Sequence, residues 1–246
     1  TETQFGTGTF EGFFIPKNGQ SIVLDKPKRS IEFIGDSAVV GYGIRSPKRE
    51  CTEEEIFSFT DTQLTYAALT AKTFNADYQI NALSGFGVVR NYNGGIPEHT
   101  FLSLYPYALN DQGALYQGDW SPNIIVIGLG GNDFANPLNP NEKWKTREVL
   151  QNDYVEHYKN FVLSLRKQHP QANFILLSYA VVGDELGGQV ARVIKELKQK
   201  GVRDIGLVTI KPIELSACHW HPSESDHKNA ADILIKHINA NPQLWN

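Results

Sequence analysis

Four short groups of small and polar residues each follow an apolar run. They are Gly35-Asp36-Ser37, Ser84-Gly85, Gly131-Asn132-Asp133 and the histidine-rich segment 218–227. Each group alone has an ordinary explanation, because Gly, Ser and Asn are common where strands turn. Together they supply a hydroxyl, a backbone donor, an amide and an imidazole, which are the groups that acyl transfer requires.

The chemistry of ester hydrolysis assigns a role to each group. Ser37 stands where a helix is expected to begin, so backbone N–H groups near its hydroxyl favour developing negative charge. A plain helix cap is the alternative role for Ser37. Gly85 lets the backbone approach a substrate oxygen, and the amide of Asn132 can donate to the same oxygen. His221 is the best general base, since Pro222 restricts its backbone.

Alternating strands and helices must position these groups. Nearly continuous apolar runs predict buried parallel strands, at Ile31–Gly35, Tyr78–Ala82, Ile124–Leu129, Phe174–Tyr179 and Ile205–Thr209. Apolar residues at helical spacing predict helices around residues 64–71, 150–165, 190–197 and 231–238. This alternation predicts an α/β fold with a doubly wound, five-stranded parallel sheet flanked by helices. In such a sheet the active site lies beyond the carboxyl ends of the strands.

Two stretches depart from this alternation. Asn18-Gly19 predicts a hairpin turn between two apolar segments, so residues 1–28 are predicted to be a β-hairpin or linker before a domain at 29–246. The chain starts at Thr1 without a charged and apolar leader, as expected for a mature or trimmed product. Residues 91–122 are rich in Gly, Pro, Asn and Tyr, and their aromatic content favours an ordered, functional loop.

Composition restricts the class of protein. The 246 residues carry a formal net charge of −4, with 41% hydrophobic and 20% charged residues, as in a soluble globular protein. The longest basic run, Lys26–Arg29, is too short for a nucleic-acid-binding face. No apolar run approaches the roughly 20 residues that cross a bilayer. We therefore expect neither a nucleic acid nor a membrane as partner, and we predict a monomer without a cofactor.

The four groups resemble, in order, the sequence blocks of the SGNH hydrolases, also called GDSL hydrolases. The segments GDSAVVGYG, NALSGFGVVRNYNG, WSPNIIVIGLGGNDF and ACHWHPSESDHKNAA further resemble family 2 of the carbohydrate esterases, over residues 29–231. The resemblance implies an SGNH (flavodoxin-like) fold and a serine esterase that removes acetyl groups from plant polysaccharides through an acyl-enzyme. It implies Ser37 as nucleophile, His221 as base, and an oxyanion hole formed by Ser37, Gly85 and Asn132.

One departure from this family concerns the partner of the base. Relatives usually carry Asp two or three residues before the catalytic His, where this chain has His219 and Cys218. Either a backbone carbonyl orients His221, which gives a Ser-His dyad, or another carboxylate replaces the missing one. The candidate carboxylates are Asp226, Glu224 and Glu214. We favour the carbonyl, because the resemblance extends to family members with such dyads.

A second departure lies at the amino terminus. Family members carry a complete β-sandwich domain before the hydrolase domain, and residues 1–28 resemble only its last hairpin. We expect these residues to be the remnant of that domain.

The sequence also predicts substrate contacts and a disulfide. Trp220 precedes the proposed base, and aromatic rings suit the apolar faces of sugars; a bracing role in the core is the alternative. Asp36 and Asn91 are further predicted substrate-binding residues. Cys51 and Cys218 are expected near the same rim, and a secreted or periplasmic esterase works where disulfides persist, so we predict a bond between them rather than two free thiols.

Three other hypotheses compete with the esterase. His219, His221 and His227, with Asp226, can be read as a zinc cluster, although their spacing matches no established zinc pattern. The same fold can serve as a non-catalytic carbohydrate-binding protein. A lipase or thioesterase is the third, but no long apolar stripe indicates an acyl-chain tunnel.

Overall fold

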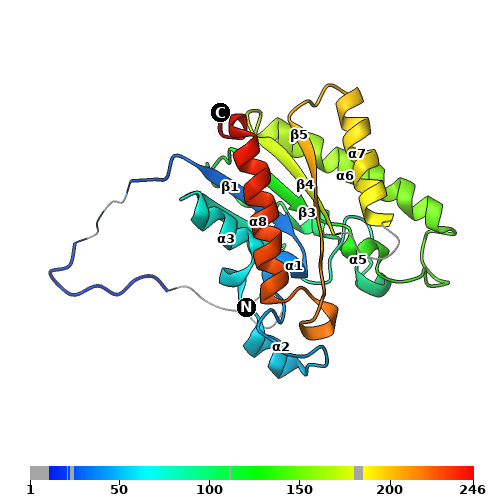
Figure 1. Ribbon diagram of the computed structural model, residues 1–246, viewed down its shortest axis with the longest axis horizontal. Helices are drawn as coiled ribbons and strands as arrows, with labels where there is room; N and C mark the ends of the chain where they lie inside the picture. Colours follow the sequence, from blue (N-terminus) through cyan, green and yellow to red (C-terminus); the bar gives the residue numbers. More distant parts are fainter. Residues whose placement is uncertain (1–10, 21, 23–24, 111, 180–184) are drawn as a thin grey trace.

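The computed structural model describes residues 11–20, 22, 25–110, 112–179 and 185–246. Five strands form one sheet in the order β2-β1-β3-β4-β5, and every neighbouring pair is parallel (Figure 1). Their bounds are Ser30–Gly35 (β1), Asp77–Ala82 (β2), Ile124–Gly128 (β3), Asn173–Tyr179 (β4) and Ile205–Ile210 (β5). The predicted fold class and all five predicted strands are confirmed.

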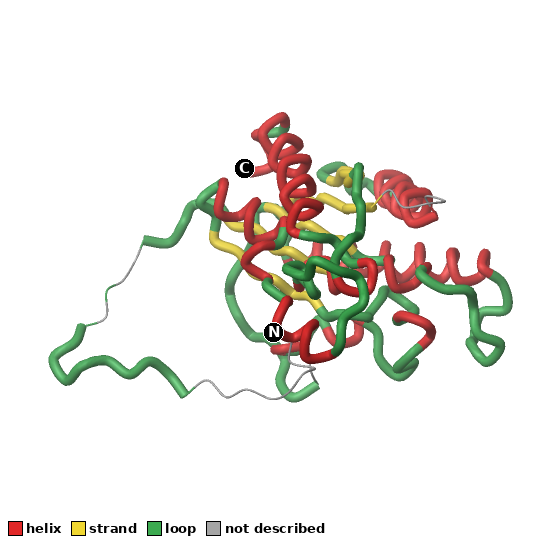
Figure 2. The backbone as a smooth tube through the Cα atoms, turned by 60° about the horizontal axis from the view of Figure 1, so that its bottom comes forward, coloured by secondary structure: helices red, strands yellow, loops and turns green. Residues whose placement is uncertain are grey.

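Helices cover both faces of the sheet, which explains why the inner strands are apolar along nearly their whole length. One face packs against α3 (Tyr66–Thr73) and α8 (Glu224–Ala240), and the other against α6 (Arg147–Gln168) and α7 (Glu185–Gln199), so the sheet is the middle of three layers (Figure 2). These helices contain the four predicted ones. The edge strand β2 is only half-buried and carries polar residues at alternate positions.

Shorter elements occupy the connections. They are α1 (Ser37–Val40), α2 (Glu53–Phe59), α4 (Phe101–Leu104), α5 (Gly131–Phe134), and the 3₁₀ turns η2 (Thr62–Leu64), η3 (Tyr92–Gly94), η4 (Ala108–Asn110), η5 (Cys218–Trp220) and η6 (Pro242–Trp245). Three of them (α4, η3 and η4) lie within the predicted loop 91–122, together with a bridge between Tyr107 and Leu115.

The described residues from 11 to 29 extend away from the sheet as a loop (Figures 1 and 2). The N–H of Gly19 donates to the carbonyl of Pro16 at 2.7 Å, which closes a turn centred on Lys17 and Asn18, one residue before the predicted Asn18-Gly19 turn. The described part of this segment contains no strand, and much of the predicted hairpin lies outside the described residues. The division of the chain at residue 28 stays a prediction.

Candidate active site

The chain turns sharply after β1 to place Ser37 at the start of α1. A Cβ at Gly35 would overlap the side chain of Val39, so only glycine allows the short helix to fold back on the strand. Asp36 caps α1, with Oδ1 accepting from the N–H of Ala38 at 3.1 Å. Ser37 is therefore the first residue of the helix and not its cap, and only 8% of its surface is exposed.

The two other predicted oxyanion residues lie beside this turn. Nδ2 of Asn132 donates to Oδ2 of Asp36 at 3.2 Å and to the carbonyl of Phe86 at 2.8 Å. Asn132 thus joins the ends of β1, β2 and β3. Gly85 has φ +81°, and no protein atom lies within 4 Å of a Cβ placed there. Glycine is required at this position by its backbone conformation rather than by crowding.

Asp133, next to the predicted Asn132, holds the loop that follows Gly85. Its carboxylate accepts hydrogen bonds from the N–H groups of Val88, Val89 and Arg90, at 2.8–2.9 Å. Burial raises the pKa of Asp133 to about 6, although these bonds oppose the shift. Sequence reasoning did not assign this role. An acidic residue directly after a buried strand and its Gly-Gly-Asn turn was the available signal.

The structure places the predicted substrate residues Asn91 and Asp36 within the framework of the site. Oδ1 of Asn91 accepts from the N–H of Gly87 at 3.1 Å, and Nδ2 donates to the carbonyls of Ile96 and His99. Asn91 is 5% exposed and shapes the loop after Gly85. Asp36 is likewise engaged with α1 and Asn132. Substrate contact by either residue stays a prediction.

A backbone carbonyl orients His221. Its Nδ1 lies 2.8 Å from the carbonyl oxygen of Cys218, and its backbone is extended, as expected before Pro222. A carbonyl only accepts, so Nδ1 carries the hydrogen and the lone pair is on Nε2. This is the tautomer that a general base for Ser37 requires.

The alternative carboxylates have other partners. The carboxylate of Asp226 accepts from the N–H groups of Glu214, Leu215 and Ser223. These bonds complete the capping box of α8 and hold the preceding loop. Glu224 is half-buried and pairs with Lys228 at 2.8 Å. Within the described residues, no carboxylate is hydrogen-bonded to His221.

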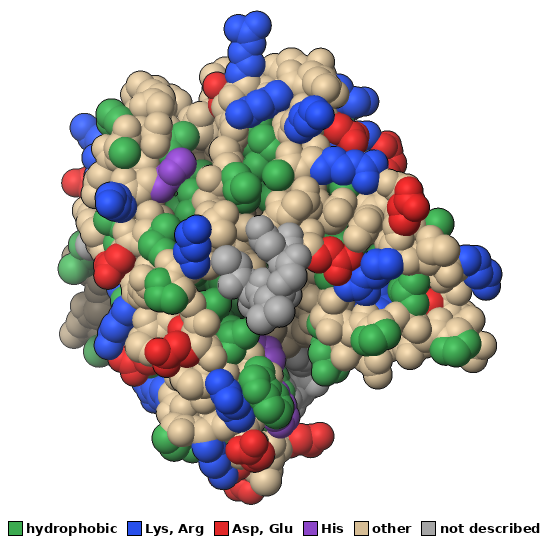
Figure 3. Space-filling view, turned by 45° about the vertical axis from the view of Figure 1, so that its right-hand side comes forward, with side chains coloured by type: hydrophobic (Ala, Val, Ile, Leu, Met, Phe, Trp, Pro, Cys, Tyr) green, Lys and Arg blue, Asp and Glu red, His purple; other side chains and the backbone are tan. Residues whose placement is uncertain are grey.

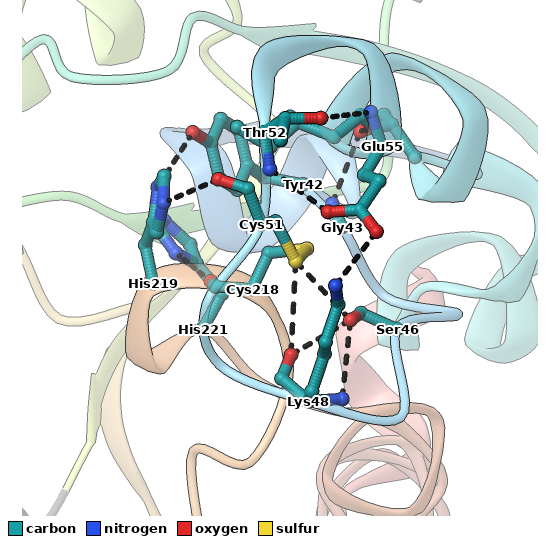
Figure 4. The surroundings of a disulfide bond; sticks show 12 residues. Tyr42, Gly43, Ser46, Lys48, Cys51, Thr52, Glu55, Cys218, His219 and His221 are labelled. Atoms are coloured by element: carbon teal, nitrogen blue, oxygen red, sulfur yellow. Dashed lines mark hydrogen bonds and ion pairs between the residues drawn. A yellow bond between two sulfur atoms is a disulfide. The ribbon is translucent and has the colours of Figure 1, made fainter.

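A disulfide fastens the loop of the base to the turn beyond the nucleophile (Figure 4). Cys51 and Cys218 are bonded, 167 residues apart in sequence and 5.5 Å between Cα atoms, which confirms the prediction. Cys218 also packs against Gly43, where a Cβ would overlap its side chain. The residue that orients His221 through its carbonyl is thus anchored through its sulfur.

Tyr42 adds a contact that sequence reasoning missed. Its ring lies 4.3 Å from the ring of His221, centroid to centroid, and its N–H donates to the carbonyl of Ser37 at 3.1 Å. Its hydroxyl lies 3.2 Å from Nδ1 of His219, whose Nε2 lies 3.1 Å from the carbonyl of Cys51 (Figure 4). Tyr42 therefore links the base to the backbone of the nucleophile.

Ser37 and His221 share this rim without a direct hydrogen bond between their side chains among the described contacts. Catalytic hydrogen bonds are often long before substrate binds and tighten in the complex. Burial lowers the pKa of His221 to about 4, against the hydrogen bond to Cys218, which raises it. The imidazole is neutral near pH 7 and can accept a proton.

The histidines of the zinc hypothesis make separate contacts. Nδ1 of His227 accepts from the N–H of Tyr66 at 3.2 Å. The ring nitrogens of His219 and His221 instead lie near the backbone carbonyls of Cys51 and Cys218. In the part of the chain that the structure describes, no three His, Cys, Asp or Glu residues are placed to hold a metal ion. None of the helices described there is long and apolar enough to cross a membrane.

Residues 31–234 match the GDSL-like lipase/acylhydrolase family, whose fold is the one described above. The chain belongs to this family. Within it, the chain is 49% identical, over all 246 residues, to an acetylxylan esterase / glucomannan deacetylase of Cellvibrio japonicus, and spans 68% of that protein. It is 30% identical to the cellulase/esterase CelE of Acetivibrio thermocellus, of which it spans 29%.

Solved structures give the same assignment. A carbohydrate esterase whose active site displays divergent catalytic and non-catalytic binding functions is 48% identical, with a TM-score of 0.92, over 96% of this chain and 72% of that one. A family two carbohydrate esterase from Clostridium thermocellum, in complex with cellohexaose, is 26% identical, with a TM-score of 0.78, over 92% of this chain and 68% of that one.

Neutralising Asp226 or Glu224 distinguishes a Ser-His dyad from a catalytic triad in which a carboxylate orients His221. We expect Asp226→Asn to retain most activity but to lower the free energy of unfolding by about 1 kcal/mol, because it weakens a helix cap. The matched variant Glu224→Gln should change neither. Activity on an aryl acetate and urea unfolding measure the two effects. A loss of activity approaching ~10⁴-fold in either variant would show that a carboxylate orients His221.

The lowered pKa of His221 predicts an unusual pH profile. We expect the acid limb of kcat/KM for an aryl acetate to fall near pH 4 rather than near the ordinary histidine pKa of about 6.5. Stability must be measured over the same range. His221 and His227 have lowered pKa values in the folded state, so their contribution to stability is full above about pH 6.5 and is lost as the pH falls toward 4. An acid limb at or above pH 6.5 in folded enzyme would contradict the prediction.

Removing the disulfide should lower stability and activity together. The chain-entropy model gives a stabilisation of about 5 kcal/mol for a loop of this length, an upper figure because native strain reduces it. We expect the double variant Cys51→Ala, Cys218→Ala to lose stability and kcat, measured by thermal unfolding and aryl acetate turnover. Unchanged kcat at a temperature where the variant is folded would show that the bond does not position the base.

Proposed function

We propose that this protein is a serine esterase that removes O-acetyl groups from a plant polysaccharide or oligosaccharide. The observation that carries the proposal is the hydrogen bond of His221 to the Cys218 carbonyl, at the rim that also holds Ser37, Gly85 and Asn132. The relatives named as acetylxylan esterase and glucomannan deacetylase support acetylated carbohydrate as the substrate.

The first half-reaction forms an acetyl-enzyme. Oγ of Ser37 attacks the acetyl carbonyl carbon while Nε2 of His221 takes the serine proton. The oxyanion accepts hydrogen bonds from the N–H groups of Ser37 and Gly85 and from Nδ2 of Asn132. Asn132 exchanges its 3.2 Å bond to Asp36 for this contact and keeps the shorter one to Phe86. The sugar oxygen leaves with the proton from His221.

Water completes the cycle. His221 removes a proton from a water molecule, whose oxygen attacks the acetyl carbon of the Ser37 ester. The second tetrahedral intermediate collapses, acetate leaves, and Oγ of Ser37 recovers its proton. A carbonyl at Nδ1 brings a dipole instead of a full negative charge, so it stabilises the imidazolium less than Asp does. The low pKa of His221 agrees with this difference.

Trp220 is the proposed sugar platform. It is 59% exposed, which argues against the alternative of a bracing residue in the core. The guanidinium of Arg49 lies 5.8 Å from the Trp220 ring, and Nε of Arg49 donates to the carbonyl of Leu215 at 2.9 Å. The ring is therefore held next to His221 on a supported loop. Acidic and basic side chains are mixed on the surface, which suits an uncharged polysaccharide better than a strongly charged one (Figure 3).

The compartment and assembly follow from the same observations. A disulfide that braces the base requires oxidising surroundings, which supports secretion or the periplasm. Every group named in the proposed reaction comes from one chain, which supports a functional monomer.

Ser37→Ala tests the proposed function. We expect a loss of kcat of about 10³-fold or more with an unchanged fold, because the nucleophile is removed. Acetate release from acetylated xylan, acetylated glucomannan and an aryl acetate measures both turnover and substrate class. Near-normal turnover by the variant would remove Ser37 from the mechanism, and release from the aryl acetate alone would argue against a carbohydrate substrate.

The variant Trp220→Ala, assayed on the same substrates, tests whether Trp220 contacts the polysaccharide. KM should rise for the polysaccharides and stay nearly constant for the aryl acetate, which is too small to reach the ring. Equal damage on all substrates would indicate a structural role for Trp220.

A further inference from the structure

A second cavity lies away from the catalytic groups, over the polar side of the edge strand β2. Its volume is about 820 Å³, within the range of ligand-binding pockets. Glu32, Gln79 and Asn81 of β1 and β2 line it, and residues 105–109, 115–121 and 168–169 close it. We infer that this cavity is an accessory binding site for an uncharged sugar chain, distinct from the active site; the class of ligand rests on the proposed function.

The cavity and the active site lie at different ends of the sheet. Residues 115–121 lead toward the start of β3, and residues 168–169 lead into the start of β4. The catalytic groups instead follow the strands. Glu32 lies within β1, three residues before the strand ends at Gly35, whereas Ser37 lies beyond that end, at the start of α1. A ligand in this cavity therefore leaves the catalytic rim open.

Glu32 gives the cavity a polar floor with unused hydrogen-bonding capacity. Only 3% of the residue is exposed, and its Oε1 accepts from the hydroxyl of Tyr105 and from Nδ2 of Asn81, each at 2.7 Å. Both of these hydrogen bonds end on Oε1, and none of the described ones ends on Oε2. A carboxylate oxygen at the floor of a cavity can accept from the hydroxyl group of a ligand.

Aromatic side chains form the walls. Tyr116 is 52% exposed, and Nε2 of Gln79 donates to its hydroxyl at 3.1 Å. Nε1 of Trp120 donates to Oδ2 of Asp77 at 2.9 Å. These bonds hold rigid rings at the cavity, and amphipathic rings of this kind provide contact area at low entropic cost.

The charges of the lining select an uncharged ligand. The lining residues include the acidic Glu32 and Asp119 and neither Lys nor Arg, so a phosphate, a uronate or free acetate is disfavoured. Burial also raises the pKa of Glu32, against the hydrogen bonds from Tyr105 and Asn81, which lower it. Hydroxyl groups around an apolar ring face, as in a pyranose chain, match the remaining amide, carboxyl and aromatic groups.

Fluorine NMR can observe this cavity separately from the active site. The chain has four tryptophans, one at the cavity (Trp120) and one beside the base (Trp220). The full chain carrying Ser37→Ala is labelled with 5-fluorotryptophan, its signals are assigned with Trp→Phe variants, and unacetylated cellohexaose, xylohexaose and mannohexaose are titrated. We expect at least one of these to shift the Trp120 signal saturably, with a dissociation constant different from that at Trp220.

Two variants connect the shift to the cavity. Tyr116→Ala and Glu32→Gln should each weaken binding at Trp120 by about fivefold to tenfold, without changing binding at Trp220 or aryl acetate turnover by chains that retain Ser37. Tyr116 is exposed, so its variant stays informative if Glu32→Gln does not fold.

The inference would be overturned if none of the three sugars shifted the Trp120 signal, or if the shift were insensitive to Tyr116→Ala. It would also be overturned if the organic cation tetramethylammonium shifted the signal and the sugars did not. Acetate release, measured separately, decides the proposed function. If the protein binds sugar at Trp120 but releases no acetate, the accessory site is supported and the proposed esterase function is wrong.

Discussion

The hydrogen bond from Nδ1 of His221 to the carbonyl oxygen of Cys218 is the contact on which the proposed chemistry depends. A carboxylate in this position would contribute charge as well as direction, whereas a carbonyl contributes direction and a smaller dipole. The orientation of the imidazole must therefore come from the rigidity of the loop. The disulfide to Cys51 and the tilted ring contact of Tyr42 with His221 supply that rigidity from the turn after the nucleophile.

The rest of the site follows from a parallel sheet whose strands end at one edge. A short helix after β1 presents Ser37, and the turn after β2 presents Gly85 in a conformation that favours glycine. Asn132 and Asp133, after β3, bind both turns through side-chain hydrogen bonds. The proposed oxyanion hole is thus assembled by polar groups that are buried and almost fully paired, which fixes their directions before a substrate arrives.

The sequence was sufficient for the strands, the main helices and the placement of four chemical groups at one rim, because apolar runs and turn residues are local signals. Tyr42 and Asp133 escaped prediction, since their roles depend on partners more than 40 residues away. Glu32 was not predicted for another reason: it lies in a run predicted as a buried strand, and its partner Tyr105 comes from a loop 73 residues further along the chain. The hairpin prediction relied on Asn18-Gly19; the observed turn runs from Pro16 to Gly19, and the described part of the segment contains no strand.

The tautomer of His221 tests the central claim most directly. Nitrogen-15 NMR of histidine-labelled protein near neutral pH distinguishes a protonated Nδ1 from a protonated Nε2, and a His221→Gln variant assigns the signals. The account predicts a neutral ring with its hydrogen on Nδ1 and a bare Nε2, because a carbonyl can only accept. A neutral ring protonated on Nε2, or an imidazolium persisting near pH 7 as beside a carboxylate, would contradict it.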